Sequence, residues 1–355
     1  MSYFRPDIEA MEGYTPGYQP KGSGWTKLNT NENPYPPSPR VLAAIRDAAG
    51  ENLRKYPDPM ADTFREAAAE LLGTSPDCIL CGNGSDDLLN MAMRAFCAQG
   101  DPVAFPYPTY SLYVTLARIQ GARPVKVEFP EDYRLPAELA TTGAPLTLLC
   151  NPNAPSGTAV CPEEVARLAD HLDGVLVVDE AYVDFADADC MELHRRLDNV
   201  IVMRTMSKSY SLAGLRFGYA AANPRLIEGL AKVKDSYNVD SLAIAGATAA
   251  IRDQNYLREN TERIRETRRH LIAALQDLGF ECYPSQTNFV LARPPAPFEA
   301  GQLFQELFDR KILVRYFDEP RLDEWLRITV GSSDEIETLL STLRNIIAAA
   351  RTGGE

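Results

Sequence analysis

Short apolar runs alternate with segments of helical spacing through the middle of the chain. Runs that stay apolar without alternation are typical of strands covered on both faces, as in parallel sheets. We therefore predict an α/β fold in which a mostly parallel central sheet is flanked by helices. The expected strands lie in 78–82, 101–107, 124–129, 146–150, 175–179, 199–205 and 215–222.

The two ends of the chain have a different pattern. The first 40 residues are rich in Gly, Pro, Tyr and Asn, which predicts an extended arm. Helical spacing is clear at 39–50, at 62–72 and from about Arg225 to Leu278, and shorter strands and helices follow. We expect an arm over 1–40 that packs on the small domain or on a dimer partner, a large domain over 41–250 and a small α+β domain over 251–355.

Composition and charge restrict the partners. The 355 residues carry a formal net charge of −13, which disfavours nucleic acid and anionic membrane surfaces. Net charge does not disfavour a small phosphorylated ligand, because local basic residues and helix ends decide that. No apolar run approaches the roughly 20 residues of a membrane span, and the opening residues lack a signal core. We expect a cytoplasmic protein.

Seven cysteines and three histidines give little support for a metal or redox site. Cys78 and Cys81 form a CxxC pair, but no second pair or nearby histidine accompanies it. Because the residues between them are Ile79 and Leu80, we interpret the pair as part of a buried strand end. We expect no metal.

Polar side chains gather where predicted strands end, and ligands bind at the carboxyl ends of strands in open α/β sheets. Four stretches have this position: GNGSDD (82–87), NPNAPSG (151–157), DEAYVDF (179–185) and TMSKSYSLAGLRFGY (205–219). Each has a simpler interpretation by itself. In the same order, the simpler interpretations are a capped helix, a rigid proline turn, a core aspartate that caps a helix, and a flexible lysine on a surface loop.

Together the four stretches supply the groups that proteins contribute to pyridoxal-phosphate chemistry. Lys208 offers an amine for the cofactor aldehyde, and Asp179 offers an acid for the pyridine nitrogen. Asn153 and Tyr182 offer donors for the phenolic oxygen. Hydroxyls, a fork-shaped cation and a helix N-terminus suit the phosphate, at Ser85, Asp86, Thr205, Ser207 and Arg216.

The order NPNAPSG, DEAY, SK and LAGLRFGY resembles the active-site core of class II aminotransferases of fold type I. The resemblance implies pyridoxal 5′-phosphate as cofactor, with Lys208 as its covalent partner and Asp179 at the ring nitrogen. It implies the same 3-oxygen donors and phosphate ligands as above. Tyr110, in PTYSLY, is similar to the aromatic residue that stacks on the cofactor ring.

Over nearly its whole length the chain most resembles the histidinol-phosphate aminotransferase family, through LNTNENPYPPSP, RKYPD, FPYPTYSLY, ILVRYF and WLRITVG. The resemblance implies histidine biosynthesis, with reversible conversion of histidinol phosphate and 2-oxoglutarate to imidazole acetol phosphate and glutamate. It also implies a homodimer with shared active sites. The implied substrate contacts are Tyr18, Asn33, Arg315, Arg327 and, from the neighbouring subunit, Tyr56, which also reaches the cofactor.

Two departures keep the family's residue types: GSDD stands where the family often has GADE, and NAPSG where it often has NNPTG. Aromatic amino-acid aminotransferases and threonine-phosphate decarboxylases share these motifs, so both remain alternatives. Two other classes are weaker. A non-catalytic module of a transcription regulator is disfavoured by the acidic charge and the lack of a DNA-binding extension. A nucleotide-dependent enzyme is disfavoured because the sequence lacks the phosphate-binding fingerprints of such enzymes.

Overall fold

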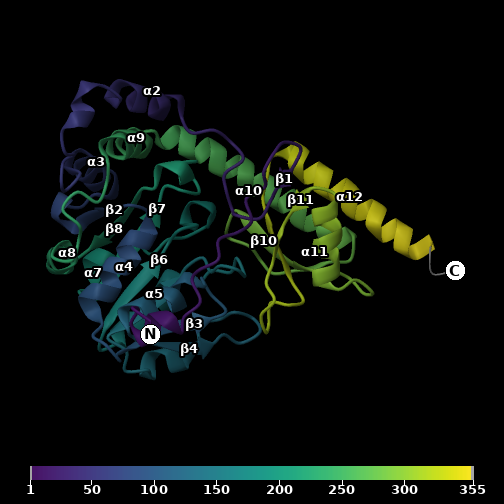
Figure 1. Cartoon of the computed structure of the whole chain (residues 1–355), viewed down its shortest axis with the longest axis horizontal. Coiled ribbons are helices and arrows are strands. Elements are labelled where there is room, and N and C mark those ends of the chain that lie inside the picture. The colour runs from purple at the N-terminus through teal and green to yellow at the C-terminus, as the bar shows by residue number, and fades with distance from the viewer. Residues whose placement is uncertain (1, 353–355) are drawn as a thin grey trace.

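The computed structural model describes residues 2–352, which form two lobes linked by a long helix (Figure 1). The larger lobe contains a seven-stranded sheet in the order β2-β8-β7-β6-β5-β3-β4. Its strands are β2 (Ile79–Gly82), β3 (Pro102–Tyr107), β4 (Arg123–Glu128), β5 (Leu146–Cys150), β6 (Val175–Asp179), β7 (Val200–Thr205) and β8 (Gly218–Ala222). Strands β3 to β7 run parallel, whereas β8 is antiparallel to both β7 and β2. The predicted α/β fold with a mostly parallel sheet is confirmed.

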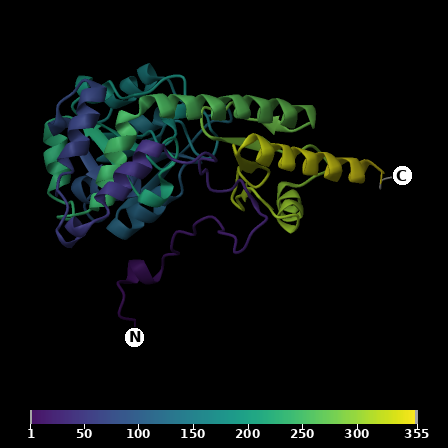
Figure 2. The ribbon, with the colours of Figure 1, turned by 90° about the horizontal axis from the view of Figure 1, so that it is seen from above.

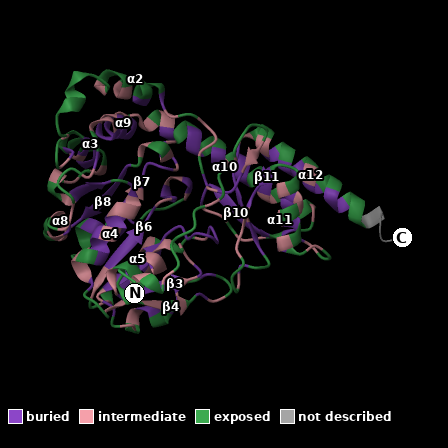
Figure 3. Cartoon of the chain, viewed as in Figure 1, coloured by how far each residue is buried: buried purple, intermediate pink, exposed green. Residues whose placement is uncertain are grey.

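Helices cover both faces of this sheet. Successive side chains of a strand point to opposite faces, and because most of these strands are apolar over most of their length, both faces need a covering layer. On β7, Ile201 and Met203 belong to one buried cluster, and Val200 and Val202 belong to the other. The first cluster includes side chains of α4 (Ser85–Phe96), α5 (Leu112–Gln120) and α8 (Pro224–Ala231). The second includes side chains of α2 (Pro39–Ala48), α3 (Asp62–Leu72), α6 (Pro162–Asp170), α7 (Leu193–Arg196) and α9 (Ser241–Arg252). Figure 3 shows the strands buried between these layers, with the exposed residues on the outer helix faces.

The helical signal expected from Arg225 to Leu278 is divided among three helices, α8, α9 and α10 (Gln254–Asp277). The loop before α9 ends at Asp240, whose carboxylate accepts hydrogen bonds from the backbone of Leu242 and Ala243 at 2.9 Å. An aspartate at this position starts a new helix by satisfying its free N–H groups. Among the described residues, the larger lobe also has five short 3₁₀ segments: η1 (Glu51–Arg54), η2 (Pro76–Cys78), η3 (Ala137–Thr141), η4 (Val183–Phe185) and η5 (Ala213–Leu215).

The smaller lobe has an antiparallel sheet in the order β12-β13-β10-β9. It consists of β9 (Glu281–Cys282), β10 (Phe289–Arg293), β12 (Arg315–Tyr316) and β13 (Leu326–Thr329), with α11 (Ala300–Asp309) and α12 (Ser333–Thr352). The helix α10 runs from the larger lobe to this one (Figure 1). The domain boundary that we propose at residue 250 falls in α9, shortly before α10 begins. Within residues 2–352, no helix is both long and apolar enough to cross a bilayer.

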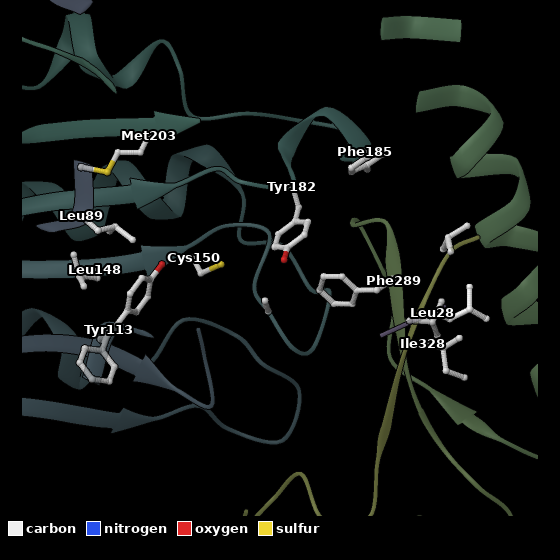
Figure 4. Close-up of a cluster of buried hydrophobic side chains, with 14 of the residues drawn as sticks. Leu28, Leu89, Tyr113, Leu148, Cys150, Tyr182, Phe185, Met203, Phe289 and Ile328 are labelled. Atoms are coloured by element: carbon white, nitrogen blue, oxygen red, sulfur yellow. The ribbon is translucent and has the colours of Figure 1, made fainter. Parts of the chain in front are cut away.

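The arm is extended for most of its length. Figure 2 shows it as a separate stretch of chain that extends from the junction of the two lobes. It contains one short helix, α1 (Pro6–Glu9), and one short strand, β1 (Thr26–Lys27). Strand β1 pairs in parallel with β11 (Ile312–Leu313), which ties the arm to the smaller lobe. Leu28 follows β1 and is buried in the same cluster as Phe289 and Ile328. Figure 4 shows this cluster extending from the large sheet to the small one.

Gly174, just before β6, allows the starts of β5 and β6 to approach closely. A Cβ at this position would lie 2.4 Å from the carbonyl oxygen of Ala144 and 2.6 Å from that of Pro145. Since both atoms belong to the backbone, Gly174→Ala should lower the free energy of unfolding by about 1–3 kcal/mol. Urea denaturation measures the change.

The matched control is Gly229→Ala, in the interior of α8, where a Cβ would meet nothing within 4 Å. Alanine is the better helix former, so this variant should have a free energy of unfolding about 0.5–1 kcal/mol higher than that of the wild type. Equal effects of the two substitutions would show that the close approach at Gly174 is not a packing constraint.

Candidate active site

The ends of the strands place the predicted site residues at one edge of the large sheet. The parallel strands β3, β5, β6 and β7 all end there. Because β8 is antiparallel, it begins at this edge and brings Arg216 to the loop that follows β7. A cavity of about 750 Å³ opens here. Its lining includes Ser85, Asp86, Tyr110, Asp179, Tyr182, Thr205, Ser207, Lys208, Arg216, Arg315 and Arg327.

Lys208 reaches the cavity from the loop after β7. Its Nζ donates to the carbonyl oxygen of Thr30 at 3.3 Å and lies 5.8 Å from the ring centre of Tyr182. Burial lowers the pKa of Lys208 to about 8, and the positive charge of Arg327 acts in the same direction. No acidic side chain forms an ion pair with Lys208 among residues 2–352. Its amine therefore loses a proton more readily than that of an ordinary lysine, which suits a nucleophile.

Asp179 ends β6 at the bottom of the cavity and is buried. Its carboxylate accepts hydrogen bonds from Tyr113 Oη at 2.8 Å and from the backbone N–H of Ala181 at 3.2 Å. Burial raises the pKa of Asp179 to about 6, although these two hydrogen bonds oppose the rise. A buried acid without a cationic partner in direct contact is prepared to pair with a positively charged ligand atom.

The predicted phosphate ligands, called the phosphate cradle below, lie where α4 begins, beside the loop after β7. Arg216 donates from Nη1 to Ser207 Oγ at 3.2 Å and from Nη2 to Asp86 Oδ2 at 3.3 Å. Thr205 Oγ1 donates to Ser207 Oγ at 3.0 Å. The guanidinium of Arg216 lies close against the backbone of Gly84, because a Cβ on Gly84 would lie 2.6 Å from Arg216 Nη2. Hydroxyls, a guanidinium and the first N–H groups of a helix are the donors that bind phosphate.

Two further arginines line the same cavity, on neighbouring strands of the small sheet. Arg315 of β12 is the direct register partner of Arg327 of β13. Arg327 donates from Nη2 to the carbonyl oxygen of Asn29 at 3.0 Å, and its buried Nε has no hydrogen-bond partner. In the described part of the chain, neither arginine has an acidic partner. Burial lowers the pKa of Arg327, and Arg315 contributes to this shift. Two unpaired guanidiniums on one cavity fit an anionic substrate.

Asn153 and Asn33 make contacts that the sequence did not predict. Asn153 Nδ2 donates to the carbonyl oxygen of Pro108 at 3.1 Å and to Ser156 Oγ at 2.9 Å, so both its amide protons are used within the protein. Asn33 Nδ2 donates to the carbonyl oxygens of Lys208 at 3.0 Å and Ser209 at 3.1 Å. Neither residue lines the cavity. Their roles at the cofactor and substrate stay predictions.

The two predicted closing tyrosines, Tyr18 and Tyr56, lie outside the cavity lining of their own chain. The ring of Tyr18 lies against Phe308, with 5.7 Å between ring centres. Tyr56 is 80% exposed and stacks on Tyr237 at 4.4 Å with an interplanar angle of 11°. Tyr56 therefore faces solvent here, and a role in a neighbouring subunit's site stays a prediction.

Other cavity residues were not found from the sequence. Tyr14, Thr30 and Asn31 of the arm line the cavity, as does the buried thiol of Cys150. Tyr113, which holds Asp179, belongs to the quoted stretch FPYPTYSLY but carried no role there. Their residue types are common in loops and cores, so no pattern in the sequence distinguished them. Cys78 and Cys81 are free thiols, and Cys81 is buried in β2.

Removing the amine of Lys208 should stabilise the cofactor-free protein at neutral pH. Because burial lowers the folded-state pKa from 10.5 to about 8, the unfolded chain binds this proton more tightly than the folded one. The wild type therefore gains stability as the pH rises from 8 to 10.5. Lys208→Met should raise the free energy of unfolding by about 1–3 kcal/mol at neutral pH. The difference between variant and wild type should become smaller at alkaline pH, where the wild-type lysine is neutral in the folded protein.

Urea denaturation across the pH range measures this effect, and Lys232→Met, at an exposed lysine after α8, is the matched control. The control should show no pH-dependent gain. A Lys208→Met protein that is less stable than the wild type at pH 7 would contradict the assigned cost of burying the amine.

Comparison with known proteins agrees with this geometry. The family model for aminotransferase class I and II matches residues 23–343. A histidinol-phosphate aminotransferase of Citrifermentans bemidjiense is 48% identical over 98% of this chain and 99% of its own length. Histidinol-phosphate aminotransferase 1 of Trichormus variabilis is 46% identical over 98% of this chain and 99% of its own.

A solved structure is similar over the same extent. The histidinol-phosphate aminotransferase from Sinorhizobium meliloti, crystallised in complex with pyridoxal-5′-phosphate, has a TM-score of 0.89 and 31% identity, and 99% of each chain is covered. The resemblance inferred from the motifs is thereby confirmed. This chain belongs to the class I and II aminotransferase family and groups there with the histidinol-phosphate aminotransferases.

Proposed function

We propose that this protein is a pyridoxal-phosphate-dependent aminotransferase of histidine biosynthesis. It reversibly converts histidinol phosphate and 2-oxoglutarate to imidazole acetol phosphate and glutamate. The observation that carries the proposal is a single cavity where three features meet. They are an amine with a lowered pKa at Lys208, the buried acid Asp179, and the arginines 315 and 327, which have no acidic partners among residues 2–352.

The donor set and the size of the cavity fit pyridoxal 5′-phosphate. When bound, the cofactor supplies an aldehyde that combines with amines and a ring that withdraws electrons from the substrate carbon. Asp179 would hold the proton of the ring nitrogen, and Tyr110 would stack on the ring. Tyr182 would donate to the phenolic oxygen. Asn153 would donate there as well once its Nδ2 releases Pro108 or Ser156. The phosphate would be held by Ser85, Asp86, Thr205, Ser207 and Arg216.

Lys208 has two tasks in this proposal. Its Nζ would hold the cofactor through its aldehyde, and the same atom would accept and return the proton of the substrate carbon. A pKa of about 8 suits both tasks, because a general base works best when its pKa lies near the working pH. Thr30 holds the amine inside the cavity through its carbonyl oxygen.

Arg315 and Arg327 bind the anionic end of each substrate. Histidinol phosphate brings a phosphate and 2-oxoglutarate a carboxylate, and one pair of guanidiniums serves both in turn. The arm residues 12–17 also line the cavity. They would restrict water around the bound substrate, which strengthens these ionic contacts.

We further propose a cytoplasmic homodimer with shared active sites. Tyr56 stacks on Tyr237 at the surface of its own lobe and exposes most of its ring. An exposed aromatic pair of this kind is typical of an interface with a partner. All seven cysteines are free thiols, which fits a reducing compartment.

The substrate class is tested with purified protein, 2-oxoglutarate and four donors: histidinol phosphate, phenylalanine, tyrosine and threonine phosphate. Histidinol phosphate should give the highest kcat/KM. Lys208→Ala should abolish turnover and the visible absorbance of the bound cofactor, because no amine remains to combine with the aldehyde. Faster turnover of phenylalanine would assign the chain to aromatic substrates. A fully active Lys208→Ala protein would refute the mechanism.

Shared active sites are tested by mixing two inactive variants, Lys208→Ala and Tyr56→Ala. A mixed dimer has one site in which both residues are intact, so free exchange of subunits should restore about a quarter of the wild-type activity. Sedimentation confirms the dimer, and Tyr3→Ala, on an exposed arm tyrosine, is a control that should stay active. A mixture that exchanges subunits but regains no activity would contradict a site built from two chains.

A further inference from the structure

Three consecutive arm residues each contact a different residue of the proposed site. The contacts are Asn29 O with Arg327 Nη2 at 3.0 Å, Thr30 O with Lys208 Nζ at 3.3 Å and Asn31 Nδ2 with Tyr182 Oη at 3.0 Å. The first two use backbone carbonyls, which any residue supplies. The third uses the side chain of Asn31, so its chemistry depends on the residue at this position.

The side chain of Asn31 has a defined orientation. Thr329 Oγ1 accepts a hydrogen bond from the backbone N–H of Asn31 at 3.0 Å, and it donates its own proton to Asn31 Oδ1 at 3.0 Å. Nδ2 is therefore the atom that faces Tyr182, and an amide nitrogen only donates. Tyr182 Oη accepts this hydrogen bond, which leaves its own proton free to be donated toward the cavity.

The backbone of Asn31 is also fixed, and it is fixed by the smaller lobe. Its φ of 56° lies in the left-handed region, which asparagine tolerates better than most residues. Its carbonyl oxygen accepts from Asn288 Nδ2 at 3.0 Å, at the start of β10. Asn31, Asn288 and Thr329 are all buried. Tyr182 belongs to the larger lobe, and its ring centre lies 5.0 Å from that of Phe289 in the smaller lobe (Figure 4).

We propose that Asn31 is a positioning residue for Tyr182, which orients the phenol so that Tyr182 donates its proton into the cofactor cavity. The inference rests on the proposed function, because it requires a bound cofactor whose phenolic oxygen faces Tyr182. Asn31 acts through Tyr182 and touches no reacting atom. Because the smaller lobe holds Asn31, the orientation of a phenol in the larger lobe depends on how the two lobes pack.

The groups that face Tyr182 keep its hydroxyl protonated. Burial raises the pKa of Tyr182 to about 12, while Arg327 and the hydrogen bond from Asn31 act against the rise, and Cys150 and Asp179 add to it. The amine of Lys208 lies over its ring. With a pKa of about 12, Tyr182 is a hydrogen-bond donor at neutral pH.

Asn31→Asp is the sharpest test. Aspartate has the same size, tolerates the same backbone and still accepts from Thr329, but it presents to Tyr182 an oxygen that accepts instead of donating. We expect kcat with histidinol phosphate to fall roughly tenfold and KM to change less than about twofold. The pH midpoint of the bound cofactor's visible absorbance should move upward, because Tyr182 no longer stabilises the negative charge of the phenolic oxygen.

Asn31→Gly is a second variant that removes the amide and keeps the left-handed backbone. It should shift the absorbance midpoint in the same direction without adding a charge. The matched control is Asn199→Asp, at an asparagine outside the cavity lining whose Nδ2 donates to the carbonyls of Ala169 at 2.9 Å and Gly174 at 3.2 Å. The control should keep the wild-type midpoint and the wild-type kcat.

The decisive comparison is Tyr182→Phe alone against Tyr182→Phe combined with Asn31→Gly. If Asn31 acts through Tyr182, the double variant should have the same kcat as Tyr182→Phe. Losses that multiply would overturn the inference, as would an unchanged absorbance midpoint in both Asn31 variants, while the proposed function would stand. A wild-type protein that forms no visible band with the cofactor would instead refute the proposed function, and the inference with it.

Discussion

An amine and a carboxylate are held in one cavity without a direct ion pair, and the rest of the site depends on this constraint. Burial lowers the pKa of Lys208 and raises that of Asp179, so each group is less charged than it would be in water. Each is left available for a ligand because other residues hold it in place: Thr30 contacts the amine, and Tyr113 the carboxylate. Such an arrangement costs stability in the empty protein, which ligand binding recovers.

The topology of the large sheet explains how these groups meet. Parallel strands deliver the residues after β3, β5, β6 and β7 to one edge. The antiparallel strand β8 completes the phosphate cradle, because reversing its direction places Arg216 at the same edge. The smaller lobe adds Arg315 and Arg327 from its own sheet, and the arm passes between the lobes and contacts both. The cavity is therefore a property of the assembled lobes, and neither lobe contains it alone.

The arm has a larger part in the site than its composition indicates. Its glycines, prolines and tyrosines predicted an extended segment, and the structure has one. Only the fold shows that β1 pairs with β11 and that residues 29–31 consequently run past Arg327, Lys208 and Tyr182. A segment without regular secondary structure satisfies its backbone groups through tertiary contacts, and here Arg327 and Lys208 make two of those contacts.

The sequence by itself determined the fold class, the positions of most strands and the groups at their carboxyl ends, because apolar runs and the polar residues after them are local patterns. It predicted for the same reason that Lys208, Asp179 and the candidate phosphate ligands lie together, and the structure brings them to one cavity. The partners of these groups, namely Tyr113, Thr30 and Asn31, were decided only by the tertiary structure. A hydrogen bond between residues 151 positions apart, as between Asn31 and Tyr182, leaves no periodic signal in the chain.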